Sequence, residues 1–218
     1  ANVYGMKALG VGWIVSVSAV GSLRDDVAPG HVVVVDQFID RTWQRPSTFF
    51  HDGIVAHASF ADPVCPTLRA LLVEAAREAG GTVHDGGTYV CMEGPAFSTM
   101  AESKAYRAMG FDVIGMTNLQ EAKLAREAEI CYTTIALVTD YDCWHPEHDS
   151  VTVDLIIANL TQNAATAQAI IAETVGRLPA SRGCACGRAL AHALITRPDH
   201  VPASVKAELA PIIGKYLS

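Results

Sequence analysis

The chain has 218 residues, half of them hydrophobic, and a formal net charge of −7 at pH 7. A chain of this length and apolar content can bury one large hydrophobic core. The excess of acidic residues and the lack of basic clusters argue against general binding to nucleic acid or to anionic membrane surfaces. No run of apolar residues is long enough to predict a transmembrane helix, and the first residues lack the pattern of a secretory signal.

Hydrophobic patterning predicts strands and helices that alternate along the chain. Strands are predicted at residues 13–19, 31–36, 82–92, 111–116 and 131–139, the third interrupted by Gly86-Gly87. Helices are predicted at residues 1–9, 66–79, 98–102 and beyond, 118–129, 151–178 and 203–216. Residues 38–61 carry no regular pattern, and we expect a functional loop there. The alternation predicts a single α/β domain over residues 1–218, with a central mixed β-sheet flanked by helices.

The six cysteines show no spacing typical of a zinc site, so no metal is expected. Four of them stand singly in apolar or strand-like segments, where a small buried hydrophobic side chain is the usual role. Cys184 and Cys186 lie in a glycine-flanked Cys-Ala-Cys segment, which is compatible either with two reduced thiols on a loop or with a disulfide. The expected compartment is the cytoplasm.

Two carboxylates follow the predicted strand at residues 131–139. Asp140 and Asp142 are two residues apart, so extended backbone through the pair would place both side chains on one side. The carboxyl ends of parallel strands are where α/β proteins bind ligands. Adjacent donor and acceptor nitrogens, as on the edge of adenine, would suit such a pair if one carboxyl carries a proton. The alternative is an aspartate that caps the next helix.

Small and polar residues follow two other predicted strands. Backbone N–H groups around Ser18 and Ala19 could bind an oxyanion, although an ordinary glycine turn explains the same residues. Thr117 precedes a predicted helix N-terminus, which is another favourable place for an anion. Met116 beside it could instead fill the core. Phe97 lies in a turn flanked by Gly and Pro, where its ring could face a planar base or pack internally.

These segments resemble the purine nucleoside phosphorylase superfamily, in particular its S-methyl-5′-thioadenosine phosphorylase branch. The resemblance runs nearly without gaps from residue 1 to about residue 175, and it is carried by five segments. They are Ser18-Ala19-Val20-Gly21-Ser22-Leu23-Arg24, Asp36-Gln37-Phe38-Ile39-Asp40-Arg41-Thr42, Glu93-Gly94-Pro95 with Phe97-Ser98, Met116-Thr117, and Thr139-Asp140-Tyr141-Asp142-Cys143-Trp144.

The resemblance implies a role for each matching position. It places phosphate against Ser18, the backbone of Ala19 and Thr117. It places Met116 under the ribose and Phe97 against the base. The implied fold is the phosphorylase fold with a central mixed sheet.

The resemblance also implies which residues determine specificity. Ser98 and Val153 occupy positions that separate this branch from the inosine and guanosine phosphorylases, which have Glu and Asn where Ser98 and Asp140 stand here. An apolar Val153 beside Ile156 suits a methylthio group. His57 matches a residue that reaches the neighbouring subunit's 5′-pocket, although an exposed loop histidine is the alternative.

The implied reaction is phosphorolysis of S-methyl-5′-thioadenosine to adenine and 5-methylthioribose 1-phosphate in methionine and purine salvage. Asp140, Tyr141 and Asp142 would bind the adenine edge, and we expect Asp140 to protonate the leaving base. This is a pentosyltransferase reaction that needs no metal or organic cofactor, with phosphate as co-substrate. Alternatives are a purine nucleoside phosphorylase of broader or 6-oxopurine specificity, a phosphate-independent nucleosidase, and a non-catalytic nucleoside-binding protein.

The chain departs from the family pattern at several places. Ala96 and Met100 stand where relatives carry Arg. The family's N-terminal portion, with its glycine-rich phosphate loop, has no counterpart, and residues 1–9 match only the second half of an amphipathic helix. We therefore expect an N-terminally incomplete domain. The family's assembly, a homotrimer or a dimer of trimers, is expected here, with the loop at residues 38–61 at the subunit border.

Overall fold

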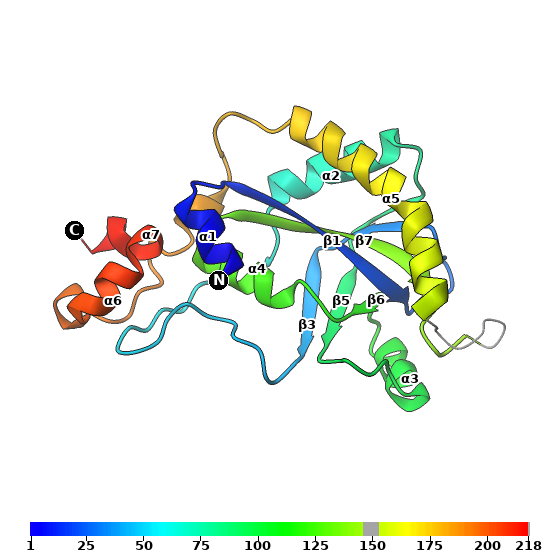
Figure 1. Cartoon of the computed structure of the whole chain (residues 1–218), viewed down its shortest axis with the longest axis horizontal. Coiled ribbons are helices and arrows are strands. Elements are labelled where there is room, and N and C mark those ends of the chain that lie inside the picture. The colour runs from blue at the N-terminus through cyan, green and yellow to red at the C-terminus, as the bar shows by residue number, and fades with distance from the viewer. Residues whose placement is uncertain (146–152, 218) are drawn as a thin grey trace.

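The computed structural model describes residues 1–145 and 153–217, which form a central seven-stranded mixed sheet (Figure 1). The strand order is β3-β5-β6-β1-β7-β2-β4. The strands are β1 (Trp13–Ser22), β2 (Val32–Val34), β3 (Gln37–Arg41), β4 (Val83–Asp85), β5 (Thr88–Met92), β6 (Val113–Gly115) and β7 (Cys131–Asp140). Both parallel and antiparallel pairs occur, which confirms the predicted sheet type.

Strand β7 is the centre of the fold. All ten of its residues are buried, because helices cover both faces of the sheet. Ile135 and Leu137 pack toward one face, whereas Tyr132 packs toward the other. β1 pairs with β7 in parallel, and a register shift after Val20 sets Gly21 opposite Asp140.

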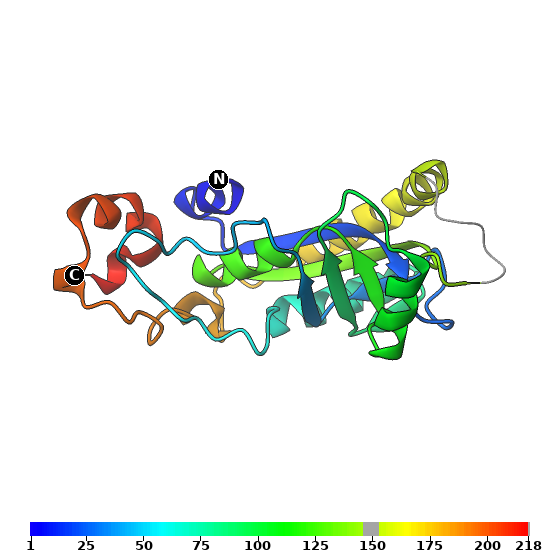
Figure 2. The same ribbon diagram turned by 90° about the horizontal axis from the view of Figure 1, so that it is seen from below.

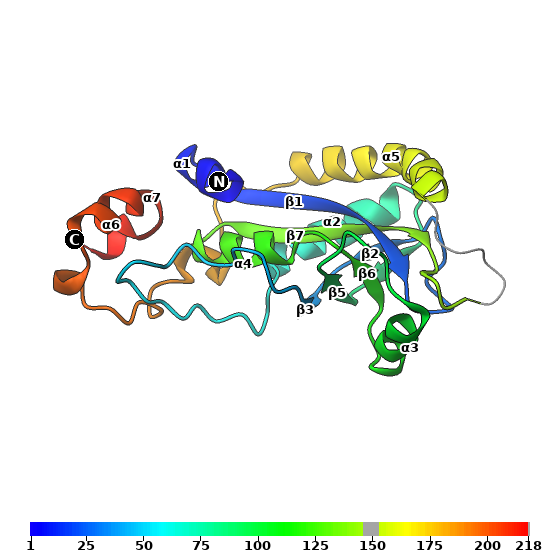
Figure 3. The same ribbon diagram turned by 60° about the horizontal axis from the view of Figure 1, so that its bottom comes forward.

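Helices α2 (Pro66–Glu78) and α5 (Val153–Gly176) lie side by side on one face of the sheet (Figures 1 and 3). Helices α1 (Asn2–Ala8) and α4 (Leu119–Glu127) pack on the other face. Among the described residues, no helix has the length and hydrophobicity needed to cross a membrane.

Helix α3 (Met100–Ala108) follows strand β5 in the chain. Its N-cap is Thr99, whose hydroxyl accepts a hydrogen bond from the Glu102 N–H while the Glu102 carboxylate accepts one from the Thr99 N–H. This reciprocal capping box fixes where the chain turns back after Phe97 and Ser98. The sequence predicted a helix from residue 98, two residues before the observed first residue, Met100.

The C-terminal part extends beyond the end of the sheet (Figure 2). The predicted single helix at residues 203–216 is wrong, because the chain forms α6 (Ala203–Glu208), α7 (Ala210–Ile213) and a short 3₁₀ turn. Pro211 lacks an N–H and fits only the first turn of a new helix, so the first helix ends before it. These helices bury Ile212 and Ile213 against Phe50 of the long loop.

Two strand predictions also need correction. The stretch predicted to be irregular from residue 38 begins with β3, an edge strand that pairs in parallel with β5. The single strand predicted at residues 82–92 is two strands, which belong to different parts of the sheet. Gly86 and Gly87 separate them, and Gly86 has φ +104°, a conformation that disfavours other residues.

Gly115, the last residue of β6, allows close contact between this strand and a tyrosine. A Cβ on Gly115 would lie 1.9 Å from the Tyr89 hydroxyl oxygen. Gly115→Ala should therefore displace that ring or the strand and lower the free energy of unfolding by about 1 to 3 kcal/mol. Urea unfolding monitored by circular dichroism measures the change.

Gly176→Ala is the control, because no atom lies within 4 Å of a Cβ added at the last residue of α5. It should leave the free energy of unfolding unchanged or raise it by up to about 1 kcal/mol. Equal unfolding midpoints for the two variants would contradict the steric argument.

Candidate active site at the carboxyl ends of β1 and β7

A cavity of about 200 Å³ opens at the carboxyl ends of β1 and β7. The parallel pairing of the two strands brings these ends to the same edge of the sheet, where α/β proteins bind ligands. Three segments complete its wall: the end of β5, the turn before α3 and the turn after β6. Its lining residues are Ala19, Val20, Gly21, Met92, Phe97, Ile114, Gly115, Met116, Thr117, Thr139, Asp140 and Asp142.

Asp140 and Asp142 both line this cavity, and each is only 6% exposed. The predicted proximity of the pair is correct, but the predicted cause is wrong. The backbone is not extended through the pair, because Asp142 has φ +53° and begins a turn. In this turn the Asp142 N–H donates a hydrogen bond of 2.7 Å to Asp140 Oδ1, which brings the two carboxyl groups together.

Burial raises the pKa of both carboxyl groups above the usual range of aspartate. The Thr139 hydroxyl and the Asp142 N–H donate hydrogen bonds to Asp140, which favour its ionised form. Burial is also the main cause at Asp142, where hydrogen bonding from the Ser103 side chain lowers the pKa and the nearby charge of Asp140 raises it. Asp142 Oδ2 is buried. The two raised pKa values favour a proton on the pair as a whole.

The turn after Asp140 is held by Trp144. Its indole N–H donates a hydrogen bond of 2.7 Å to the carbonyl of Ser22 at the end of β1. The Arg107 guanidinium lies 3.4 Å from the centre of the Trp144 ring, a cation–π contact from α3. The Tyr141 ring stacks on His145 with 4.6 Å between the ring centres. Tyr141 is not among the described residues that line the cavity, and its contact with the base stays a prediction.

Three hydroxyl groups meet at Thr117, which lines the cavity. Ser18 Oγ lies 2.9 Å from Thr117 Oγ1 and 3.1 Å from Tyr89 Oη, and Ala19 lines the cavity beside them. The three residues predicted to contact phosphate are thus brought together. Tyr89 was not predicted, since a tyrosine inside an apolar strand has the pattern of a core residue.

The wall between the carboxyl pair and the hydroxyls is apolar. Met92, Ile114 and Met116 line it, and Phe97 is 45% exposed at its rim. A planar base could therefore lie between these side chains with its polar edge at the aspartates. Ser98 follows Phe97 in the chain, and its carbonyl accepts a hydrogen bond from the Cys143 thiol.

His57 and Val153 are not among the described residues that line this cavity. His57 is exposed, and its N–H donates to the carbonyl of Ala193 in the C-terminal part. Val153 is 61% exposed at the start of α5. The side chain of Ile156 lies outside the described part of the structure.

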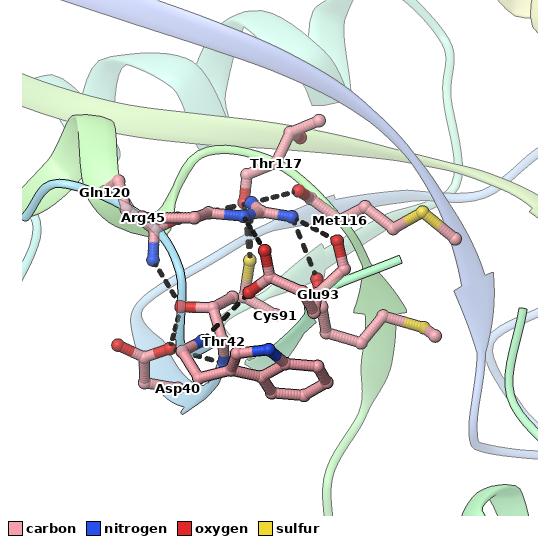
Figure 4. Close-up of polar contacts among 10 residues, drawn as sticks. Asp40, Thr42, Arg45, Cys91, Glu93, Met116, Thr117 and Gln120 are labelled. Atoms are coloured by element: carbon pink, nitrogen blue, oxygen red, sulfur yellow. Dashed lines mark hydrogen bonds and ion pairs between the residues drawn. The ribbon is translucent and has the colours of Figure 1, made fainter. Parts of the chain in front are cut away.

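Arg45 connects backbone segments that adjoin the cavity (Figure 4). Its guanidinium donates hydrogen bonds to the carbonyls of Met116 at 2.5 Å, Glu93 at 2.6 Å and Met92 at 3.2 Å. Its Nε also lies 3.5 Å from the carboxylate of Glu93, which accepts a hydrogen bond from the Trp43 N–H. One side chain of the long loop thus joins the ends of β5 and β6, a role that the sequence did not reveal.

Residues 1–176 match the sequence profile of the Phosphorylase superfamily, and the chain belongs to this superfamily. It is 61% identical over 218 residues to the S-methyl-5′-thioadenosine phosphorylase of Geobacter sulfurreducens, covering 100% of this chain and 76% of that protein. It is 60% identical to the protein of the same name from Koribacter versatilis, covering 99% and 74%. The resemblance and the fold predicted from the sequence are thereby confirmed.

Solved structures agree with this family. A crystal structure of a methylthioadenosine phosphorylase from an Antarctic soil metagenomic library matches with a TM-score of 0.92 and 50% identity, covering 97% of this chain and 75% of that chain. A methylthioadenosine phosphorylase from Schistosoma mansoni in complex with adenine matches with a TM-score of 0.81 and 33% identity, covering 98% and 76%.

Asp142→Asn should change the pH dependence of stability. Because the pKa of Asp142 is raised on folding, the folded state binds the proton more tightly, and wild-type stability falls as the pH rises through that pKa. Asparagine does not titrate, so the stability of the variant does not fall in this way. It should be more stable than wild type above the folded pKa by about 1 to 3 kcal/mol, and the advantage should vanish near the unfolded pKa of about 4.

Thermal unfolding of both proteins from pH 4 to pH 8 measures this difference, with Asp62→Asn as a control for the loss of an exposed charge. A variant that is less stable than wild type at every pH would contradict the assigned burial cost.

Arg45→Ala should leave three carbonyls and the Glu93 carboxylate without their partner. We expect the free energy of unfolding to fall by about 2 to 4 kcal/mol, with looser placement of the two methionine carbonyls at the cavity. Urea unfolding measures the loss. Arg41→Ala removes an exposed arginine from the end of β3 and should cost less than about 0.5 kcal/mol; an equal effect of both variants would refute the role of Arg45.

Proposed function

We propose that this protein catalyses the phosphorolysis of S-methyl-5′-thioadenosine to adenine and 5-methylthioribose 1-phosphate. It is a pentosyltransferase of the superfamily identified above. The observation that carries this proposal is the buried pair of Asp140 and Asp142 in the cavity. Relatives at 60% and 61% identity bear the name of this activity.

The acid pair suits the edge of a 6-aminopurine. One carboxylate accepts the hydrogen bond of the exocyclic amine, and a protonated carboxyl donates to ring N7. A 6-oxopurine presents an acceptor at the position of the amine, and such a buried mismatch costs about 1 to 3 kcal/mol. Sites built on hydrogen bonds reject the wrong partner far better than apolar pockets do. Adenine nucleosides are therefore the substrates that this pair favours.

Ser98 and Val153 are the further specificity positions of the proposal. The small Ser98 side chain adds no third acidic group beside Asp140 and Asp142, in contrast to the glutamate of the 6-oxopurine branch. Val153 is apolar and exposed within this chain. It can therefore contribute to a methylthio pocket that His57 of a neighbouring subunit completes.

The hydroxyls of Ser18 and Thr117, with the backbone at Ala19, can bind phosphate oxygens through neutral donors. Phosphate attacks the anomeric carbon of the ribose as the C–N bond to the purine breaks. The bonding electrons leave with the base, and the proton held by the aspartate pair passes to N7. Neutral adenine then departs. This sequence of events needs no metal and no organic cofactor, since phosphate is the co-substrate.

We also propose a homotrimer, or a dimer of trimers, in the cytoplasm. The long loop supports an assembly because it exposes Trp43 to 74% and Val55 to 46%, and large exposed apolar side chains mark interaction surfaces. Six free cysteines are typical of a reducing compartment.

Asp140→Asn should lower kcat/KM for methylthioadenosine by about 100- to 10,000-fold, the range of general acid catalysis. The amide can donate to a 6-oxo group, so the ratio of activities should shift toward 6-oxopurine nucleosides. Steady-state assays with methylthioadenosine and inosine measure both effects. Asp62→Asn, on the exposed loop before α2, should keep the wild-type activity.

Phosphate dependence tests the reaction type. Adenine release should require inorganic phosphate and yield a sugar 1-phosphate. Equal release without phosphate would assign the protein to the nucleosidases instead, and binding of methylthioadenosine without turnover would leave only a nucleoside-binding role. Unchanged kinetics of Asp140→Asn would refute the role of the pair.

A further inference from the structure

Four of the six cysteines gather at the end of β7 that lies away from the active site. Cys131 is the first residue of β7, Cys65 is the N-cap of α2, and Cys184 and Cys186 flank Ala185 in the segment after α5. Their Sγ atoms all lie within 4.8 Å of one another. The sequence predicted no metal site, because the thiols come from three segments far apart in the chain.

We propose that these four cysteines bind a structural zinc ion. A tetrahedral zinc site has Zn–S bonds of about 2.3 Å, so its sulfur atoms lie about 3.8 Å apart. The Cys184 Sγ lies 3.4 Å from the Cys131 Sγ and 3.7 Å from the Cys65 Sγ. The remaining distances between sulfur atoms are at most 4.8 Å, so shifts of no more than about 1 Å would give the geometry of four thiolate ligands.

The surroundings of the cluster suit thiolates. The Sγ of Cys65 accepts a hydrogen bond from the Leu68 N–H at 3.5 Å, at the N-terminus of the 13-residue helix α2. The positive end of this helix stabilises a negative sulfur. Four thiolates with one Zn²⁺ carry a net charge of −2. Arg182 and Arg188 line the opening beside Cys184 and can offset that charge.

The arrangement favours one ion over two disulfides. All six cysteines are free, so the Cys184–Cys186 disulfide that the sequence allowed is absent from the structure. The Cys184 Sγ contacts both Cys131 and Cys65, and no pair of sulfurs stands apart from the other two. Three of the four thiols are buried, and Cys184 is half-buried at the opening, which provides an entry path.

We assign the ion a structural and not a catalytic role, because the cysteine cluster lies far from the aspartate pair. Cys131 and Asp140 are at opposite ends of a ten-residue strand, which separates them by about 30 Å. The ion would instead join the start of α2, the start of β7 and the C-terminal segment that follows α5. Binding would release four thiol protons and add to the free energy of folding.

The test uses the full-length protein, produced with added zinc and purified without chelator. We expect one zinc per chain by elemental mass spectrometry and six alkylatable thiols after unfolding and removal of the metal. Cobalt exchanged for zinc should give the intense thiolate-to-metal absorption of a tetrahedral site. Cys186→Ser should lose most of the zinc, whereas Cys143→Ser, outside the cluster, should keep one per chain.

If Cys186→Ser does not fold, the cobalt spectrum of the wild type and the fall of its Tm on chelation decide the question. A wild-type protein that takes up neither zinc nor cobalt under reducing conditions overturns the proposal. Four thiols that resist alkylation in that protein would show a pair of disulfides in place of the ion, and six reactive thiols a metal-free cluster.

Discussion

Two carboxyl groups buried in one cavity cannot both be charged without a large cost, and this constraint organises the site. Burial raises the pKa of Asp140 and of Asp142, and the charge of Asp140 raises the pKa of Asp142 further. The pair is nevertheless buried, because β7 is covered on both faces and its carboxyl end lies at the cavity. In the proposed reaction, a proton held by this pair would pass to the departing purine base.

Strand β7 connects two chemically different ends of the molecule. Its carboxyl end holds the aspartates, and its amino end lies in the four-cysteine cluster. At the first end, polar groups are left available for a substrate; at the second, thiols from three segments meet where the C-terminal part joins the sheet. Under the two proposals made above, the same buried strand contributes catalytic acids at one end and a structural metal ligand at the other.

Local patterns predicted most of the strands and the position of the acid pair. The alternation of side chains along a strand predicted that Asp140 and Asp142 lie close together. This position is correct but the predicted cause is wrong, because a turn with positive φ at Asp142 brings them together. Contacts between distant segments could not be predicted from the sequence. Arg45 reaches the ends of β5 and β6, and the Tyr89 hydroxyl contacts both the Ser18 hydroxyl and the Thr117 N–H.

The central claim is that the aspartate pair holds one proton and donates it to N7 of adenine. Binding of adenine and of 7-deazaadenine, which has a C–H group in place of N7, tests this claim most directly. Loss of the acceptor should leave a buried O–H without a partner and cost about 1 to 3 kcal/mol, so Kd should rise by about 5- to 150-fold. Equal affinity for the two bases would contradict the account.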